Sequence, residues 1–298
     1  MLNILVLKVR TMGKKIDGKA LSEKLLSNIF KKVQDIRDNN HVIPIGWYYM
    51  AIVTVGDDPA SQVYVKNKLA AAEKAGIKAT HIKLGGTLKV GYFQVKTILE
   101  GLNSDRNCKG IILQLPLPTY LREETQNLLN IIAPTKDIDG FRNSQLFFNG
   151  SEYEGLVPCT PKGIMKIIND EGYELRGKHV VIINRSNVVG KPLAMMMLNH
   201  DATVTICHSC TENLKEICKT ADVLVSAVGK PHFIKKDWIK PGSFLIDVGI
   251  YKEDNKVFGD IDPECYEPSG WYTPVPGGVG PMTVAMLINN FVKTSTSI

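Results

Sequence analysis

Apolar segments alternate along the chain with segments of helical periodicity. The apolar segments are rich in β-branched residues, and they predict strands at 48–56, 109–118, 179–184, 203–208, 221–229 and 243–249. Strands that are apolar throughout and are separated by helices are typical of a parallel sheet covered by helices on both faces. The pattern therefore predicts an α/β fold.

The chain is expected to form two lobes. Its 298 residues lie at the length, about 250–300 residues, where one hydrophobic core becomes hard to extend. Prolines in the segment 154–163 interrupt both helix and strand, and the four strands after it are spaced as in a doubly wound, Rossmann-type nucleotide-binding unit. A final helix at 281–293 is expected to return to the first lobe. We therefore place the first domain at 12–157 plus 280–298 and the second at 158–279.

Composition and charge narrow the class of protein. The chain is 44% hydrophobic and 22% charged, as globular proteins are. A net charge of +6 from scattered lysines fits a small anionic ligand better than a nucleic acid. The apolar N-terminus is too short to span a bilayer, so no membrane association is expected. Residues 1–11 are interpreted as an extension before Met12, and a cytoplasmic location is expected, with organelle targeting as the alternative.

The six cysteines do not form a dense framework, which indicates reduced thiols in a cytosolic protein. Cys207 and Cys210 form a CxxC pair. A zinc site needs a second ligand pair with matching spacing, and the sequence has none. The pair is therefore interpreted as the end of a strand and a loop, and no metal is expected.

A tyrosine and a lysine are expected on one face of a helix. Asp58 can cap a helix whose first turn holds Pro59, and Gly76 can end it. Tyr64 and Lys68 then lie one turn apart. A lysine near a helix N-terminus opposes the helix dipole, which favours the loss of its proton, and a tyrosine offers a flat face to an aromatic ligand. The alternative is a solvated lysine beside a tyrosine at the core margin.

Two further polar positions are candidates for ligand binding. Gln114 follows a buried strand, at the sheet edge where open α/β folds bind ligands, and its amide can bond a lysine amine or a ligand carbonyl. Asp137 and Asp139 precede Gly140. A carboxylate there can accept parallel hydrogen bonds from a ring with adjacent N–H groups, such as a pterin. A satisfied glutamine and an ordinary Asp-Gly turn are the alternatives.

The segment 179–198 has the order strand, loop, helix that is typical of a nucleotide site. Gly190 and Pro192 mark the helix start, where backbone amides can hold a phosphate, although the loop lacks a GxGxxG pattern. A common NAD site has an acidic residue after the next strand, for the ribose hydroxyls. Here Ser209 follows that strand and Arg185 lies in the first loop, which favours a 2′-phosphate and hence NADP over NAD. A surface arginine is the alternative.

The segment TPVPGGVGPMT (273–283) is predicted to be a rigid loop. Its glycines and prolines fix an irregular backbone that can approach a flat ring closely, and a helix follows at once. A linker is the alternative.

Together these segments resemble the bifunctional methylenetetrahydrofolate dehydrogenase/cyclohydrolase family. The matching segments, in the family's order, are VGDDPASQVYVKNK, GIILQLPLP, KDIDGF, PCTPKGI, RSNVVGKP, CHS, ADVLVSAVGKP, LIDVGI, GDID and TPVPGGVGPMT. The resemblance implies a first lobe that holds folate, a Rossmann-type second lobe that holds the nicotinamide cofactor, and an active-site cleft between them. It also implies a homodimer formed through the cofactor domains.

The resemblance implies a two-step reaction of one-carbon metabolism. The methylene bridge of 5,10-methylenetetrahydrofolate is oxidised to the 5,10-methenyl cation, and water then opens that ring to give 10-formyltetrahydrofolate. In this reading Lys68 activates water and shuttles protons, and Gln114 holds and tunes its amine. Tyr64 stacks on the aminobenzoate group, and Asp139 binds the N–H edge of the pterin.

The same resemblance implies the residues of the cofactor side. Arg185 and Ser209 are expected to hold the 2′-phosphate, and Gly190 is expected at the helix turn near the other phosphates. The further cofactor candidates in the matching segments are Ser186, Gly229 and Gly249. The turn that is expected to line the folate and nicotinamide pocket is Pro276, Gly277 and Gly278.

Two positions depart from the family pattern and leave alternatives open. Asn184 stands where the loop often begins with glycine, and we expect asparagine to tolerate a positive φ there. Cys210 stands where a basic residue is common, which removes one possible phosphate contact. The alternatives are an NAD-dependent dehydrogenase with little or no cyclohydrolase activity, a dehydrogenase for a cyclic hydroxy acid, and a regulatory protein that binds the nucleotide without chemistry.

Overall fold

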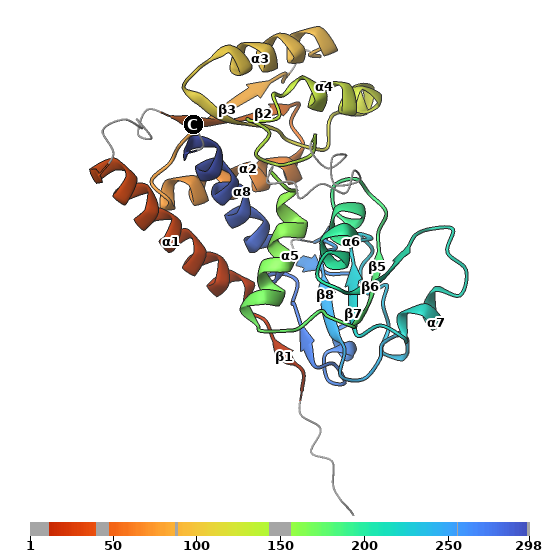
Figure 1. Cartoon of the computed structure of the whole chain (residues 1–298). Coiled ribbons are helices and arrows are strands. Elements are labelled where there is room, and N and C mark those ends of the chain that lie inside the picture. The colour runs from red at the N-terminus through yellow and green to blue at the C-terminus, as the bar shows by residue number, and fades with distance from the viewer. Residues whose placement is uncertain (1–11, 40–47, 87–88, 143–155, 255, 297–298) are drawn as a thin grey trace, which may run out of the picture. The chain divides into compact units, whose positions relative to one another are not determined.

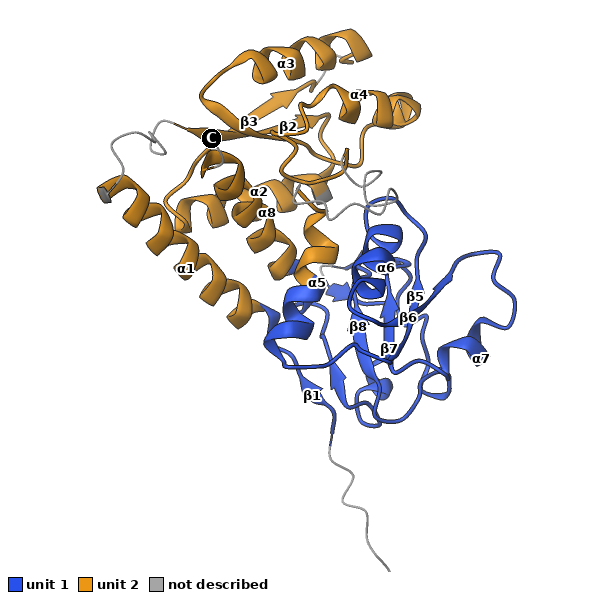
Figure 2. Cartoon of the chain, in the orientation of Figure 1, with its two compact units in different colours: residues 1–18, 164–280 blue, residues 19–163, 281–298 orange. Residues whose placement is uncertain are grey.

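The structure, a computed structural model, describes residues 12–39, 48–86, 89–142, 156–254 and 256–296. The chain divides into two compact units (Figure 2). The described part of unit 1 spans residues 12–18 and 164–280, and that of unit 2 spans residues from 19 to 163 and from 281 to 296. Each unit contains a parallel sheet, so the predicted two-domain α/β fold is confirmed.

Unit 2 is built around a three-stranded parallel sheet in the order β3-β2-β4. Its strands are β2 (Tyr49–Val55), β3 (Lys78–Leu84) and β4 (Cys108–Leu113). The central strand is buried from its second residue onward, as its unbroken apolar sequence predicts. The edge strand β3 is partly exposed along its length, and the sequence pattern missed it because its apolar residues are interrupted by polar ones.

Helices cover both faces of this sheet (Figure 1). The helices α3 (Tyr92–Ser104) and α4 (Thr125–Ile131) lie on one face, where Leu99 and Leu128 pack with Val53 of β2. The helices α2 (Pro59–Lys74) and α8 (Val279–Thr296) lie on the other, with α1 (Gly18–Asn39) beside them. A short 3-10 helix (Thr119–Glu124) precedes α4, and α5 (Cys159–Asp170) follows the residues 143–155 that lie outside the description.

Unit 1 is built around a six-stranded parallel sheet in the order β1-β11-β8-β7-β5-β6. The strands are β1 (Lys14–Lys15), β5 (His179–Ile183), β6 (Thr203–Cys207), β7 (Val223–Ser226), β8 (Phe244–Asp247) and β11 (Trp271–Tyr272). The helices are the part of α5 from Ile164 onward, α6 (Gly190–Leu198) and α7 (Leu214–Cys218). An antiparallel pair, β9 (Tyr251–Glu253) and β10 (Lys256–Phe258), and two 3-10 helices (Lys236–Trp238 and Pro263–Cys265) complete the unit.

The division of the chain differs from the expected one at two short segments and at Gly280, which we expected in the first lobe and which belongs to unit 1. We expected the first lobe to begin at residue 12, whereas Lys14 and Lys15 pair with β11 in the sheet of unit 1. We expected the second lobe to begin at residue 158, whereas residues up to Gly163 belong to unit 2. Among the described residues, none of the helices has the length and apolar character needed to cross a membrane.

Candidate active site

Tyr64 and Lys68 lie on α2, which begins and ends as the sequence predicts. The carboxylate of Asp58 accepts a hydrogen bond from the backbone N–H of Ser61 at 2.7 Å, and Pro59 fills the first turn. Gly76 follows the helix with a φ of +68°. Lys68 is 7% exposed and Tyr64 is 38% exposed. The lysine therefore faces the interior of unit 2, while the tyrosine ring keeps a surface open to a ligand.

Lys68 forms a buried ion pair with Asp139. The Lys68 Nζ atom lies 3.3 Å from the Asp139 Oδ2 atom, and both side chains are 9% exposed. The two residues are 71 positions apart in the sequence. This pairing differs from the contact that the resemblance implies, in which Gln114 holds the lysine amine.

Asp137 builds the turn that presents Asp139. Its buried carboxylate accepts hydrogen bonds from the backbone N–H groups of Gly140 at 3.1 Å and Arg142 at 2.7 Å. Burial raises the pKa of Asp137 to about 6, and the charge of Asp139 contributes. Gly140 has a φ of +77°, and a Cβ atom there would lie 2.6 Å from the Val157 carbonyl carbon. In the KDIDG segment Asp137 therefore makes the turn, while Asp139 faces the lysine. Both interpretations of the aspartates apply, each to a different residue.

Lys136, the first residue of that segment, connects the segment to the end of α3 through hydrogen bonds. Its Nζ atom donates to the carbonyl oxygens of Leu102, Asn103 and Asp105 at 3.0, 2.7 and 2.7 Å. These acceptors belong to the last turn of α3 and the residue after it, where carbonyl groups lack partners within the helix. The ammonium group therefore ends α3 and fixes the start of the turn that carries Asp139.

Asn290 of α8 supports the same turn from the other side. Its Nδ2 atom donates to the carbonyl oxygens of Ile138 at 2.9 Å and Val157 at 3.1 Å, and its Oδ1 atom accepts from Lys162 Nζ at 2.6 Å. Asn290 is fully buried, and burial lowers the pKa of Lys162. The sequence reading missed Asn290. A polar residue at a buried position of an otherwise apolar helix face was the available signal.

Gln114 is buried at the carboxyl end of β4, where it was expected. Its Nε2 atom donates to the Leu115 carbonyl oxygen at 2.8 Å. Its Oε1 atom is buried and has no hydrogen-bond partner among the described residues. A buried acceptor without a partner is costly, so this oxygen is suited to receive a donor from a ligand.

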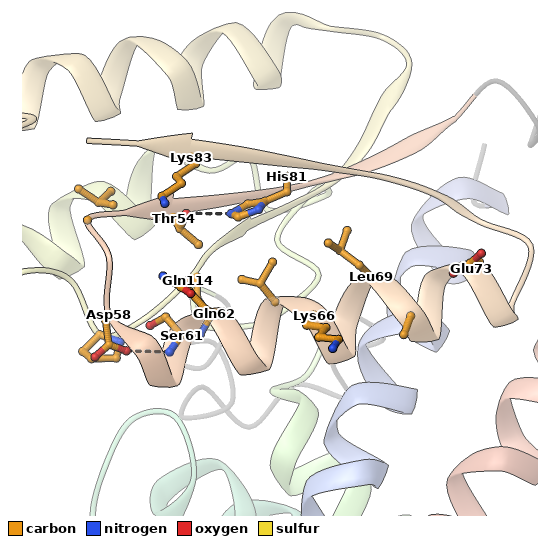
Figure 3. A pocket seen from close by; sticks show the side chains of 15 residues that line it. Thr54, Asp58, Ser61, Gln62, Lys66, Leu69, Glu73, His81, Lys83 and Gln114 are labelled. Atoms are coloured by element: carbon orange, nitrogen blue, oxygen red, sulfur yellow. Dashed lines mark hydrogen bonds between the residues drawn. The ribbon is translucent and has the colours of Figure 1, made fainter. Parts of the chain in front are cut away.

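A pocket of about 530 Å³ lies between α2 and the strands β2 and β3 (Figure 3). Thr54 and His81 point into it from the sheet and are joined by a 2.9 Å hydrogen bond, while Lys66 lines it from the helix. Burial and the charge of Lys83 lower the pKa of His81. In the part of the chain that the structure describes, the lining includes Gln114 but neither Lys68 nor Asp139.

Arg185 and Ser209 lie beyond the ends of two neighbouring strands in unit 1. The strands β5 and β6 are parallel, with Ile183 opposite Cys207, and each candidate follows two residues after its member of this pair. Both candidates are exposed. The fold therefore brings them to the same sheet edge, as a site for one phosphate group requires.

Asn184 closes the loop between β5 and α6 with its side chain. Its Oδ1 atom accepts from the backbone N–H groups of Ser186 at 2.8 Å and Gly190 at 3.0 Å, and its Nδ2 atom donates to the Ala227 carbonyl at 2.7 Å. Asn184 is not among the residues with positive φ, so our explanation of this residue by a positive φ is wrong. Gly190 is required because a Cβ atom would lie 2.0 Å from the Asn184 carbonyl oxygen.

The other glycine candidates of unit 1 lie in loops, where two of them have a positive φ and two are in close contact with neighbouring groups. Gly229 has a φ of +76°, and a Cβ atom on Gly249 would lie 1.9 Å from the Asp260 carboxylate. In the turn 276–278, Gly277 has a φ of +104°, and a Cβ atom on Gly278 would lie 2.6 Å from the Pro274 carbonyl oxygen. Among the described residues, no group of three or more histidine, cysteine or acidic side chains is placed to hold a metal ion.

Comparisons with known proteins agree with the two-domain fold. Residues 16–139 match the family model described as tetrahydrofolate dehydrogenase/cyclohydrolase, catalytic domain. Residues 158–297 match the model described as tetrahydrofolate dehydrogenase/cyclohydrolase, NAD(P)-binding domain. The chain is 46% identical over 286 residues to the bifunctional protein FolD of Clostridium novyi, and the match covers 95% of this chain and 99% of that protein.

Solved structures give the same result. The bifunctional FolD of Campylobacter jejuni superimposes with a TM-score of 0.87 at 39% identity, over 95% of this chain and 98% of that one. The methylenetetrahydrofolate dehydrogenase-cyclohydrolase of Trypanosoma brucei, complexed with NADP and an inhibitor, superimposes with a TM-score of 0.88 at 30% identity. That match covers 96% of this chain and 98% of the other.

Proposed function

The chain belongs to the tetrahydrofolate dehydrogenase/cyclohydrolase family, and we propose that it performs both reactions with NADP as its cofactor. Its activities are methylenetetrahydrofolate dehydrogenase and methenyltetrahydrofolate cyclohydrolase. The substrate, 5,10-methylenetetrahydrofolate, is oxidised to the 5,10-methenyl cation, and that cation is hydrolysed to 10-formyltetrahydrofolate.

The buried Lys68–Asp139 pair is the observation that carries this proposal. Hydrolysis adds a water oxygen to the methenyl carbon and breaks one of the two carbon–nitrogen bonds. The added oxygen becomes the formyl carbonyl oxygen, so the water loses both of its protons, one to the leaving nitrogen and one to solvent. The leaving nitrogen gains a proton, so one group that accepts and returns protons serves the whole step. Lys68 is the titratable amine at this position, and it lies one turn of α2 from Tyr64.

Asp139, Tyr64 and Gln114 are proposed to place the folate against that amine. The Asp139 carboxylate can accept hydrogen bonds from the pterin N–H edge while its Oδ2 atom stays beside Lys68. The exposed ring of Tyr64 offers a face for the aminobenzoate group. The unpartnered Oε1 atom of Gln114 is suited to accept a bond from the lysine or from the substrate.

The residues of unit 1 fit a nicotinamide dinucleotide with a 2′-phosphate. Arg185 and Ser209 lie exposed at one sheet edge, and no acidic side chain follows β6 at the position that would favour a free ribose hydroxyl. Gly190 and Gly249 have no room for a Cβ atom, and Gly229 has a positive φ, so the surrounding loops require glycine at these positions. When bound, NADP accepts the hydride that leaves the methylene carbon. The turn 276–278 is proposed to line the pocket for folate and nicotinamide.

The proposal is tested first by initial rates. We expect oxidation of 5,10-methylenetetrahydrofolate to be faster with NADP than with NAD at equal concentration, and to proceed to the formyl product.

Arg185→Ala should raise the KM for NADP about 10- to 100-fold, because a charge-assisted bond to phosphate is lost, and should leave the KM for NAD within about twofold. Arg176→Ala, an exposed arginine of the same unit, is the control. Equal effects of Arg185→Ala on both cofactors would refute the 2′-phosphate site.

A homodimer through unit 1 is also proposed. β6 lies at the edge of the six-stranded sheet, and Ile206 on it is 39% exposed. An edge strand pairs with its sheet on one side only, so with an exposed apolar side chain it is suited to pairing with a second copy. Light scattering after size-exclusion chromatography should give twice the chain mass of 33.0 kDa, and Ile206→Lys should shift the protein towards the monomer. A wild-type protein that elutes as a monomer at micromolar concentration would contradict this assembly.

A further inference from the structure

The Asp260 carboxylate is the centre of an unusually complete set of hydrogen bonds. Asp260 is fully buried. Its Oδ2 atom accepts from the Ser226 hydroxyl at 2.8 Å and from the backbone N–H of Val228 at 2.6 Å. Its Oδ1 atom accepts from the backbone N–H groups of Gly229 at 2.8 Å and Lys230 at 2.9 Å. Three successive amides of one loop therefore share a single side-chain acceptor that lies 30 to 32 residues further along the chain.

Asp260 is itself held in place from two directions. Its backbone N–H donates to the Asp247 Oδ1 atom at 2.9 Å, and the next N–H, of Ile261, donates to Asp247 Oδ2 at 2.9 Å. Its carbonyl oxygen accepts from the Ile234 N–H at 2.9 Å. Burial raises the pKa of Asp247 to about 7, with the charge of Asp260 contributing. A Cβ atom on Gly259 would lie 2.0 Å from the Asp247 carboxylate, so the two segments are in close contact.

The loop that Asp260 holds lies at the ligand-binding edge of the sheet. The strands β7 and β8 are parallel and place Ser226 opposite Asp247, and residues 227–230 follow β7 directly. Open parallel sheets bind their ligands outside the carboxyl ends of such strands. The same loop is joined to the β5–α6 loop, because the Ala227 carbonyl accepts the bond from Asn184. Two loops that approach a dinucleotide in this fold class are thus connected.

We infer that Asp260 is a positioning residue for the cofactor: it fixes the loop 228–230 in the conformation that binds NADP. The inference rests on the proposed function, in which unit 1 holds the dinucleotide. Without the carboxylate, the N–H groups of the loop and the buried Ser226 hydroxyl lose their shared acceptor, and the loop samples other conformations. Binding then requires that the loop be ordered first, which weakens the affinity for the cofactor. Hydrolysis of the methenyl cation uses residues of unit 2 and does not consume the cofactor.

The test is Asp260→Asn, which keeps the shape but replaces one acceptor oxygen with a donor. We expect the KM and the Kd for NADP to rise at least tenfold, with a smaller fall in kcat. Cyclohydrolase activity on preformed methenyltetrahydrofolate, assayed without nucleotide, should stay within twofold. The control is Asp262→Asn, two residues along the same segment. Asp262 accepts from Lys235 Nζ and from the Glu264 N–H rather than from the loop, and asparagine caps a helix as well as aspartate does.

Other outcomes overturn the inference in distinct ways. An unchanged Kd for NADP in folded Asp260→Asn refutes the positioning role. A parallel loss of both activities with a lowered melting temperature shows a general structural role instead. If Asp260→Asn cannot be purified, Ser226→Ala is the variant that tests the inference. It removes one of the four hydrogen bonds to the Asp260 carboxylate and leaves no buried charge unpaired. It should raise the Kd for NADP about two- to fivefold, and an unchanged Kd refutes the inference. A wild-type protein that binds NADP but lacks turnover would contradict the proposed function alone.

Discussion

Lys68→Met is expected to lower the cyclohydrolase rate by about 10²- to 10⁴-fold, the range that a positioned proton-transfer group contributes. Methionine keeps the length and the apolar stem of the side chain, so packing on α2 changes little. What is lost is the amine beside Asp139. The measurement is the disappearance of methenyltetrahydrofolate in a buffer that does not itself catalyse its hydrolysis.

The matched control for this result is Lys66→Met. Lys66 lies two residues earlier on α2 and lines the pocket beside β3, on another face of the helix from the Asp139 contact. Its substitution should leave the rate within about twofold. Because Lys68→Met also leaves a buried carboxylate without its partner, the melting temperature of each variant should be measured alongside. Retention of cyclohydrolase activity in folded Lys68→Met would exclude this lysine as the proton-transfer group.

The sequence predicts those parts of the fold that depend on local chemistry. Asp58, Pro59 and Gly76 bound α2 through capping, so the placement of Tyr64 and Lys68 on one helix could be derived from residues close to them in the chain. The strand ends that carry Gln114 and Arg185 also follow from local patterns, since long apolar segments mark buried parallel strands.

Contacts over long sequence separations could not be derived in this way. The partner of Lys68 is 71 residues distant, and the partners of Asp260 lie 30 to 34 residues before it. For Asn184, even contacts with residues close to it in the chain could not be derived from the sequence. Its position suggested a backbone role, whereas its side chain supplies the hydrogen bonds that close the loop. A side chain's partners are set by the packed tertiary structure, and local propensity does not contain that information.

Asn290→Leu is expected to lower the free energy of unfolding by about 3–5 kcal/mol, although leucine has nearly the same volume. The substitution removes the hydrogen bonds of Asn290 to the carbonyl groups of Ile138 and Val157 and to the ammonium of Lys162. The Ile138 carbonyl then keeps only the weak bond from the Cys159 thiol at 3.3 Å. Burial already lowers the pKa of Lys162, and the loss of the Asn290 oxygen removes a group that stabilises its charged form. Urea denaturation followed by circular dichroism measures the change.

The neighbouring residue supplies the control that separates this effect from helix propensity. Asn289 lies on the same helix but is only partly buried, so Asn289→Leu should change the stability by less than about 1 kcal/mol. Below the unfolding transition, Asn290→Leu should also raise the KM for the folate substrate, because the bonded Ile138 carbonyl directly precedes Asp139. Equal stabilities of the two variants would show that the α8 contact does not fix this turn. A lowered stability with an unchanged KM would show that the turn keeps the position of Asp139 by its other bonds, those of Asp137 and Lys136.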